Sequence, residues 1–485
     1  MESIWSKTVS IKNHPTLQGD LTVEAAVIGG GLAGILTAFF LKQRNVKTVV
    51  LEAAQVGSGQ TKNTTAKITS QHNLIYNKLI GSFGEDEARQ YAQANEQAIQ
   101  EYRRIIKEQS IDCDFQEFPA YLYSQNEQDV PKLQQETDAA KRLGIDAEFT
   151  SETELPFSVA GAVKFHGQAQ FNPLAFLQTI SSDLDIFEHT KVITVEGNRI
   201  VTDQGTVTAK YIVFATHFPF LNVPGFYFAR MHQERSYVLA LEDAAELNGM
   251  YLGVDDQGLS FRNFNRVLLL GGGGHRTGEN SAGGKYSFLR QQAKQLYPQS
   301  REILHWSAQD CMTLDCIPYI GQFSSSTPDW YVATGFGKWG MTSSMVAAKL
   351  ISDEITGVEN PHSKVFSPLR FTPSASMKTL VTDMGQAVKG LSRQVFSLPA
   401  EDAQAVPVGH GGVVEYEGEK VGVYKDEDEN VFVVSTQCPH LGCQVEWNPD
   451  EKSWDCPCHG SRFDYKGNLI DNPAQTNLQS AINRG

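Results

Sequence analysis

Two short loops near the C-terminus, CPHLGC and CPCHGS, constrain the fold of this chain more than any other feature. Each loop carries one cysteine and one histidine close together, Cys438 with His440 and Cys456 with His459. Thiolate and imidazole groups are ligands for zinc and for iron in proteins. The C-terminal region is therefore expected to fold so that both loops meet around one metal centre.

Two kinds of metal centre use such ligands. A Cys₂His₂ zinc site is one alternative, but C-x-H paired with C-x-x-H on two similar loops differs from zinc-finger spacing. In a Rieske 2Fe–2S centre, two thiolates bind one iron and two imidazoles bind the other. We therefore predict a Rieske cluster with Cys438, His440, Cys456 and His459 as its ligands.

The two loops resemble those of the Rieske proteins of cytochrome bc complexes. Cys443 and Cys458 occupy the positions of a cysteine pair that forms a disulfide in that family. The resemblance implies the same disulfide here, although disulfides are uncommon in the cytoplasm and a reduced pair is the alternative. Ser461 matches the family hydroxyl that donates to a cluster sulfide, but Phe463 stands where high-potential members carry tyrosine. Because one donor is lost, we expect a lower potential than in those members.

The region around these loops is acidic and has the pattern of a small β domain. From Ser397 onward the chain has six basic and 15 acidic residues, a net charge of −9 out of −15 for the whole protein. Alternating apolar and polar residues from Gly411 to Cys438, separated by turn residues, predict short antiparallel strands. The negative charge argues against nucleic-acid binding.

The N-terminal region carries a nucleotide-binding pattern. Val23–Glu52 reads as an apolar strand, a glycine-rich turn, a helix and a second strand. Gly29, Gly31 and Gly34 fill the three glycine positions of G-x-G-x-x-G, which needs residues without a Cβ for the turn and for close backbone contact with a pyrophosphate. Glu52 ends the second strand, where a carboxylate accepts hydrogen bonds from a ribose and disfavours NADP. A glycine-rich turn without a ligand is the alternative.

Further segments follow in an order that resembles the D-amino-acid oxidase-like flavoproteins, which include glycine and sarcosine oxidases. These segments are AAQVGSGQTKNTTAKIT, YIVFATH, RVLLLGGGGH, DCMTLDCIPYIG and WYVATGFGKWGMT. The resemblance implies bound FAD and an α/β Rossmann-type FAD-binding domain with an inserted α+β substrate subdomain, beside the small all-β Rieske domain. It also implies further FAD-binding residues: Thr61, Val192, Gly337, Gly340 and Met341. GGGGH lacks the spacing of a second nucleotide fingerprint, so an organic substrate is a more plausible electron donor than NADH.

Polar and aromatic residues near the expected flavin face are candidates for the substrate pocket. They are Lys67, His72, Arg235, Tyr237, Arg262, His275 and Lys338, of which Lys67, Arg262, His275 and Lys338 are the predicted catalytic residues. Arg262 or Arg235 would pair with a substrate carboxylate, and Lys338 would stabilise reduced flavin. Each of these residues also has an ordinary interpretation as a packing or surface residue.

The sequence predicts three parts. Residues 1–370 form the FAD-binding domain, with substrate-side segments at roughly 85–150 and 218–300, residues 371–396 form a linker helix, and residues 397–485 form the Rieske domain. We expect the two domains to fold separately. The chain has no secretory signal and no transmembrane segment by its apolar pattern, so we predict a cytoplasmic protein.

Together these features predict an FAD-dependent oxidoreductase, an amine or amino-acid dehydrogenase. Electrons would pass singly from reduced flavin to the Rieske cluster and then to an external acceptor protein. One alternative is a reductase that runs in reverse, from an external carrier through the cluster to FAD. The other is a non-catalytic redox sensor. A Rieske oxygenase is disfavoured, because no histidine pair at short helical spacing is present to hold a mononuclear iron.

Overall fold

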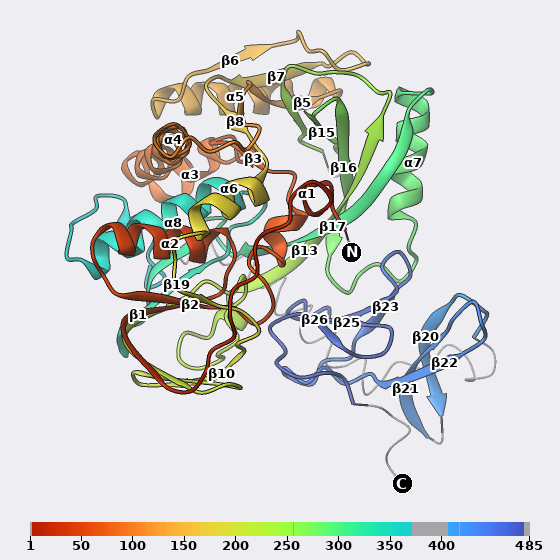
Figure 1. Cartoon of the computed structure of the whole chain (residues 1–485). Coiled ribbons are helices and arrows are strands. Elements are labelled where there is room, and N and C mark those ends of the chain that lie inside the picture. The colour runs from red at the N-terminus through yellow and green to blue at the C-terminus, as the bar shows by residue number, and fades with distance from the viewer. Residues whose placement is uncertain (1, 256, 371–405, 417, 480–485) are drawn as a thin grey trace.

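The computed structural model describes residues 2–255, 257–370, 406–416 and 418–479 (Figure 1). Two large sheets with their helices form the N-terminal part, and a small β domain at the C-terminus packs beside them. The predicted linker helix, 371–396, lies outside the described residues. No helix of the described part combines the length and apolar character needed to span a bilayer.

The first sheet is built around the predicted βαβ unit. Its strands are β1 (Leu21–Ile28), β2 (Thr48–Leu51), β9 (Ile186–Phe187), β10 (Val192–Glu196), β11 (Arg199–Thr202), β12 (Thr206–Phe214), β18 (Tyr319–Ser324) and β19 (Thr327–Thr334). β1 pairs in parallel with β2 and β12, and the helix α2 (Leu32–Gln43) connects β1 to β2. Strand β1 is buried over its last four residues, Ala25–Ile28, which is typical of a parallel strand covered on both faces.

A second eight-stranded sheet lies beside the first (Figure 1). Its strand order is β17-β13-β16-β15-β14-β5-β7-β6. The strands are β5 (Ala120–Ser124), β6 (Ala147–Thr150), β7 (Gly161–Phe165), β13 (Met231–Glu242), β14 (Met250–Gly253), β15 (Ser260–Phe264), β16 (Val267–Arg276) and β17 (Arg301–Thr313). β7 and β17 belong to this sheet although they lie outside the predicted segments 85–150 and 218–300. Each of them pairs with a strand that lies inside one of these segments.

The helices pack on these sheets and on one another. They are α1 (Ile4–Thr8), α3 (Tyr76–Phe83), α4 (Glu85–Glu108), α5 (Val130–Arg142), α6 (Pro173–Ser181), α7 (Lys285–Leu296), α8 (Gly340–Ile355) and α9 (Ser363–Phe366). Short 3₁₀ turns are η1 (Gln60–Asn63), η2 (Glu127–Asp129) and η3 (Tyr227–Ala229), and β3 (Lys67–Ile68), β4 (Gln116–Glu117) and β8 (Ala169–Gln170) form a small separate sheet. α2 and α8 pack against each other beside the first sheet.

The C-terminal domain consists of two small antiparallel sheets, as the alternating pattern predicts. One sheet contains β20 (Gly411–Tyr416), β21 (Glu419–Lys425) and β22 (Val431–Ser435), and the other contains β23 (Glu446–Asn448), β24 (Ser453–Asp455), β25 (Arg462–Asp464) and β26 (Leu469–Asp471). Trp454 and Phe463 are fully buried between them. The two Cys/His loops connect β22 to β23 and β24 to β25, so this domain holds them side by side.

Candidate functional site

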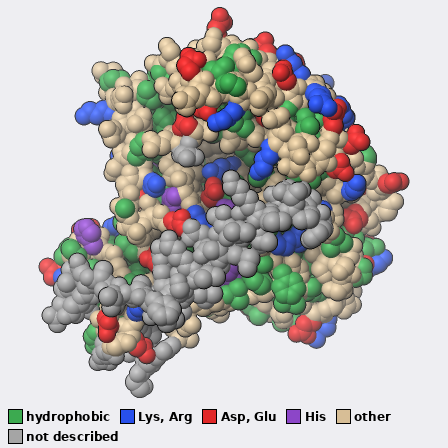
Figure 2. All heavy atoms as spheres, turned by 180° about the vertical axis from the view of Figure 1, so that it is seen from behind, with side chains coloured by type: hydrophobic (Ala, Val, Ile, Leu, Met, Phe, Trp, Pro, Cys, Tyr) green, Lys and Arg blue, Asp and Glu red, His purple; other side chains and the backbone are tan. Residues whose placement is uncertain are grey.

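A cavity of about 970 Å³ lies between the two large sheets of the N-terminal part. It is lined by the predicted FAD-binding residues Gly29, Gly31, Glu52, Thr61, Val192, Gly337, Gly340 and Met341, and by the predicted catalytic residues Lys67, His275 and Lys338. Viewed from behind, the molecule has a hollow in which Lys or Arg, Asp or Glu and His side chains gather (Figure 2). The cavity therefore brings together segments that are far apart in the sequence.

The fingerprint glycines are required by close backbone contacts. Gly29 has a φ of +111°, and a Cβ on it would lie 2.5 Å from the carbonyl oxygen of Ala215. A Cβ on Gly34 would lie 2.0 Å from the carbonyl oxygen of Gly29. Gly34 does not line the cavity, so its part in the fingerprint is to let α2 approach β1.

Glu52 and Thr61 shape the wall beside this turn. Both carboxylate oxygens of Glu52 accept backbone hydrogen bonds, from Gly30 at 2.6 Å and from Ala54 at 2.7 Å. Burial raises the pKa of Glu52, against the lowering effect of these hydrogen bonds. The hydroxyl of Thr61 accepts from the backbone N–H of Leu32 at 3.1 Å, at the start of α2. This donor and acceptor set, with the glycine turn, fits a dinucleotide.

The predicted glycine motif before α8 is also at the cavity wall. Gly337 has a φ of +58°, and α8 begins at Gly340 without a side-chain cap on its first turn. The N-terminal N–H groups of α8 carry the positive end of the helix dipole, which favours negative charge in the cavity.

Lys67 presents an amine to the cavity from β3. Its Nζ donates to the carbonyl oxygen of Tyr251 at 3.0 Å and to the hydroxyl of Ser260 at 2.6 Å. Burial, and the nearby positive charge of Arg262, lower the pKa of Lys67 from 10.5 to about 7. A substantial fraction of Lys67 is therefore neutral at neutral pH, which equips it to accept a proton.

Lys338 lies in the cavity beside two carboxylates, those of Glu234 and Asp310, which were not among the residues predicted from the sequence. Its Nζ lies 3.1 Å from Oε2 of Glu234, and Glu234 and Asp310 both line the cavity. Burial alone would lower the pKa of Lys338, but these two carboxylates outweigh it and raise the pKa. Burial raises the pKa of Asp310 to about 7, against the lowering effect of Lys338. Glu234 stands in the polar stretch HQERS of β13 and Asp310 in the stretch SAQDC of β17, and neither stretch carries a sequence signal that separates a cavity carboxylate from a surface one.

His275 lies on the same wall, at the end of β16. Its Nε2 contacts the hydroxyl of Tyr237 at 3.0 Å, its Nδ1 contacts the carbonyl oxygen of Arg276 at 2.7 Å, and its ring stacks on Tyr237. Burial lowers the pKa of His275, which favours the neutral ring.

The four predicted cluster ligands converge in the C-terminal domain. Cys438 and Cys456 are buried, are not part of a disulfide and lie within hydrogen-bonding contact of each other. The rings of His440 and His459 lie 4.8 Å apart, at 89° to each other. Within the described residues, the buried Nδ1 of His440 has no hydrogen-bond partner. Two thiols beside two imidazoles fit the ligand set of a Rieske cluster.

The predicted disulfide is present between Cys443 and Cys458. It lies beside Cys456, because the sulfur atoms of Cys443, Cys456 and Cys458 are all within 4.8 Å of one another. Since two of these sulfurs are bonded to each other, this trio is a disulfide next to one predicted ligand and not a second metal site.

Protein-family models match both parts of the chain. The model of the FAD dependent oxidoreductase family matches residues 24–354, and the model of the Rieske [2Fe-2S] domain matches residues 397–481. The chain belongs to the FAD dependent oxidoreductase family. It is an oxidoreductase of this family with a C-terminal Rieske domain, and its cofactors are FAD and a 2Fe–2S cluster.

Individual relatives cover the whole chain or its FAD-binding part. YhfW of Bacillus subtilis, which is named as a Rieske 2Fe-2S iron-sulfur protein, is 37% identical over 98% of this chain and 96% of its own length. Gamma-glutamylputrescine oxidoreductase of Escherichia coli is 23% identical over 78% of this chain and 94% of its own. The crystal structure of glycine oxidase from Geobacillus kaustophilus, 18% identical, matches with a TM-score of 0.62 over 72% of this chain and 99% of that one, which shows the shared fold.

The Rieske domain docks on the FAD-binding part through its cluster loops. Gln233 donates from Nε2 to the carbonyl oxygen of His459 at 2.7 Å, and Nε2 of His440 donates to Oδ1 of Asn222 at 2.7 Å. Gly460 has a φ of +82°, and a Cβ on it would lie 2.6 Å from the Cβ of Gln233. The docking contact is therefore close and includes both predicted histidine ligands.

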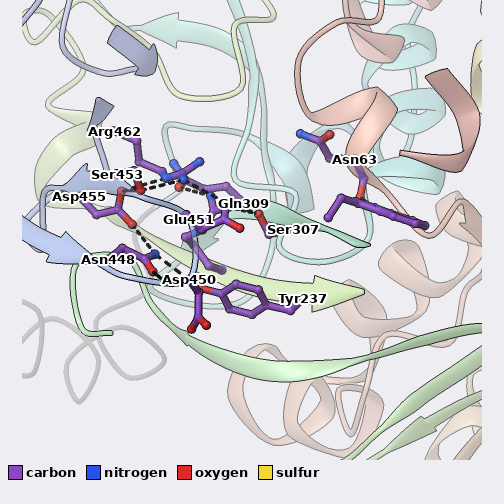
Figure 3. A network of polar contacts seen from close by, with 12 residues as sticks. Asn63, Tyr237, Ser307, Gln309, Asn448, Asp450, Glu451, Ser453, Asp455 and Arg462 are labelled. Atoms are coloured by element: carbon purple, nitrogen blue, oxygen red, sulfur yellow. Dashed lines mark hydrogen bonds and ion pairs between the residues drawn. The ribbon is translucent and has the colours of Figure 1, made fainter. Parts of the chain in front are cut away.

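A buried ion-pair network joins the two domains next to these loops. Glu451 of the Rieske domain lies 2.6 Å from Arg235 and 3.2 Å from Arg462, and all three side chains are almost completely buried. Figure 3 shows Glu451 and Arg462 beside Ser307 and Gln309 of β17. The two domains are thus joined by buried ion pairs. The sequence-based expectation of separately folding domains did not foresee this interface.

Two arginines predicted to bind a substrate carboxylate have other partners. Arg235 points to the domain interface and pairs with Glu451. Arg262 donates to the carbonyl oxygens of Thr65 at 2.6 Å and Ala66 at 2.9 Å, lies over the Trp5 ring and does not line the cavity. The catalytic assignment of Arg262 is corrected accordingly: its donors fix the segment before Lys67.

His72 also lies outside the cavity lining. Its ring nitrogens contact Tyr91 at 2.6 Å and Thr69 at 2.8 Å, and the ring stacks on Trp339. Burial lowers the pKa of His72 to about 3, so the ring is a neutral packing residue behind the cavity wall.

Proposed function

We propose that this oxidoreductase is a dehydrogenase that passes electrons between FAD and the Rieske cluster within one chain. The observation that carries the proposal is the strand β13. Its Glu234 lines the FAD cavity, while the preceding residue, Gln233, bonds the main chain of His459. FAD supplies hydride acceptance and the cluster supplies one-electron transfer. Consecutive residues of one rigid strand therefore contact both cofactor sites.

The proposed substrate is an amine or an amino acid. Support comes from the names of similar proteins, which include gamma-glutamylputrescine oxidoreductase, glycine oxidase and L-amino acid deaminase. The cavity offers both signs of charge, with Glu234 and Asp310 for an ammonium group and Lys338 for a carboxylate. An external protein is proposed as the final electron acceptor, and the cytoplasm as the location.

Lys67 is proposed as the proton acceptor of the reaction. An amine substrate is protonated at neutral pH, and it must lose one N–H proton before the hydride leaves from the adjacent carbon. The neutral form of Lys67 accepts this proton. The hydrogen bonds from Lys67 Nζ to Tyr251 and Ser260 hold the lysine side chain in place. The two electrons leave with the hydride, and the substrate becomes an iminium ion.

The remaining proposals follow from the same geometry. Cys438, His440, Cys456 and His459 bind the cluster, and the domain limits are proposed at 1–370 and 397–485. His275 is proposed to line the substrate side of the cavity together with Tyr237.

The experiment begins with purified full-length protein, which is expected to show flavin absorption bands and a Rieske signal in its reduced EPR spectrum. An anaerobic panel of N-methylated amino acids, cyclic amines, D-amino acids and polyamine derivatives is then mixed with the protein. One class is expected to bleach the flavin and to produce the reduced-cluster signal. Reduction of both centres by an external carrier, with no response to any amine, would instead establish the reverse direction. Reduction of both centres by a carrier without conversion of any substrate would establish a redox sensor.

Replacement of Phe463 by tyrosine is expected to raise the cluster potential. Phe463 is fully buried in the Rieske domain and occupies the position of the donor tyrosine of high-potential members. A hydroxyl there donates a hydrogen bond that stabilises the reduced, more negative cluster. Each rise of about 59 mV corresponds to a tenfold change in a one-electron equilibrium constant.

The potential is measured by redox titration followed by EPR. Phe432→Tyr is the matched control, because Phe432 packs against Tyr465 elsewhere in the same domain. An equal change in both variants, or no change in Phe463→Tyr, would contradict the role assigned to this position.

A further inference from the structure

We infer that the Rieske domain forms part of the FAD-binding site and retains the cofactor. Six residues of its C-terminal segment line the same cavity as the glycine fingerprint: Leu469, Ile470, Asp471, Asn472, Ala474 and Gln475. We call residues 469–475 the closing segment. The inference rests on FAD as the cofactor and is independent of the substrate and of the direction of electron flow.

The closing segment is fastened to the loop that follows β12. Nδ2 of Asn472 donates to the carbonyl oxygens of Thr216 at 2.9 Å and Phe218 at 2.7 Å. The first residue of this loop, Ala215, is the one whose carbonyl oxygen approaches Gly29 of the fingerprint. One loop of the FAD-binding domain thus contacts both the nucleotide turn and the Rieske domain.

Two further contacts fasten the segment to other parts of the cavity wall. Nζ of Lys191 donates to the carbonyl oxygen of Gln475 at 2.5 Å, and Nε2 of Gln60 donates to Oδ1 of Asp471 at 3.0 Å. Lys191 and Gln60 are themselves cavity-lining residues, next to the predicted FAD-binding residues Val192 and Thr61. Three separate stretches of the FAD-binding domain therefore meet the closing segment at the cavity.

The closing segment is rigidly linked to a cluster loop. The hydroxyl of Ser461 accepts from the backbone N–H of Ala474 at 2.9 Å, and Arg462 lies 3.0 Å from Asp471. Ser461 is the last residue of the loop that carries Cys456 and His459, and Arg462 directly follows it. A movement of the cluster loop away from the FAD-binding domain would therefore carry the cavity wall with it.

Replacement of Asn472 by alanine tests the inference in the full-length holoprotein. The variant loses two hydrogen bonds at the wall, so FAD is expected to dissociate about tenfold faster. The rate is followed by the rise of flavin fluorescence after dilution, and the cluster is followed by EPR. Asn468→Ala is the matched control, because Nδ2 of Asn468 bonds Asp464 in an exposed turn of the same domain and lies outside the cavity lining. Equal release rates in Asn472→Ala and wild type would overturn the inference, as would an equal increase in the control.

Hydrogen exchange provides a second test that needs no variant. Wild-type protein is compared with and without FAD, which is removed and added back to the full-length chain. Binding of FAD is expected to slow exchange in the closing segment as well as in the fingerprint region, because binding and wall closure are linked. Slower exchange at residues 29–34 with no change at residues 469–475 would overturn the inference even if the Asn472 variant folds poorly.

Discussion

Replacement of Glu451 by alanine is expected to release the Rieske domain from the FAD-binding domain. The carboxylate of Glu451 lies 2.6 Å from Arg235 and 3.2 Å from Arg462, and it accepts from Ser307 at 2.6 Å. Without it, the side-chain hydrogen bonds of Arg235 within the described residues go to the neutral groups of Ser307 and Gln309. Removing one partner of a buried ion pair costs about 3–5 kcal/mol, because the other charge stays buried. That cost falls on the docked arrangement of the two domains.

Small-angle scattering measures the separation of the domains, and a larger radius of gyration is expected for Glu451→Ala. Glu427→Ala is the matched control in the same domain, because Glu427 forms an exposed pair with Lys452 at 3.8 Å and such pairs contribute about 0–1 kcal/mol. The double variant Glu451→Met with Arg235→Met is expected to dock again, since apolar side chains replace a buried pair without leaving a charge. An unchanged radius in Glu451→Ala would show that the ion pair does not hold the domains together.

The local parts of this architecture could be predicted from the sequence. The two Cys/His loops and the fingerprint glycines are short segments in which chemistry dictates residue type and spacing. The structure places Gly29 and Gly34 against backbone atoms that leave no room for a Cβ, as that chemistry requires. The alternating strands of the C-terminal domain were predicted for the same reason, because their pattern is contained in neighbouring residues.

The partners of long charged side chains could not be predicted, because they depend on distant parts of the chain. Arg235 and Glu451 are separated by 216 positions, and Arg262 reaches Thr65 across 197 positions. An arginine in a strand of the second large sheet has the same sequence environment whether it faces the cavity or a docked domain. Only the register of β13 against β17, which directs Arg235 away from the cavity and Glu234 into it, separates the two cases.

Replacement of Lys67 by methionine is expected to lower kcat/KM about 10²–10⁴-fold at pH 8, where the amine of the native enzyme is mostly neutral. The pKa of Lys67, lowered by burial to about 7, predicts that activity of the native enzyme rises with pH through this value as the proton acceptor is freed. In Lys67→Met this rise is expected to disappear. The measurement is kcat/KM against pH with the amine that bleaches the flavin. Lys164→Met is the control, because Lys164 of β7 pairs with Glu148 of the neighbouring strand β6 and lies outside the cavity lining.

The Lys67→Met variant is expected to be more stable than the native protein although it is less active. The pKa of Lys67 falls from 10.5 in the unfolded chain to about 7 in the folded protein, so between these values the unfolded state binds more protons and native stability increases with pH. Below about pH 7 the folded protein carries an unfavourable buried charge, which methionine removes. Lys67→Met is therefore expected to melt at a higher temperature than the native protein at pH 6 while being less active.

Lys67→Arg distinguishes proton acceptance from charge pairing. A guanidinium retains its positive charge throughout the working pH range and does not accept a proton. If Lys67 removes the substrate proton, the arginine variant is expected to be as inactive as the methionine variant. Retained activity in Lys67→Arg would instead identify Lys67 as a fixed cation for a substrate carboxylate. That result would also move the proton acceptor to the group formed by Glu234 and Asp310, where burial raises the pKa of Asp310 to about 7.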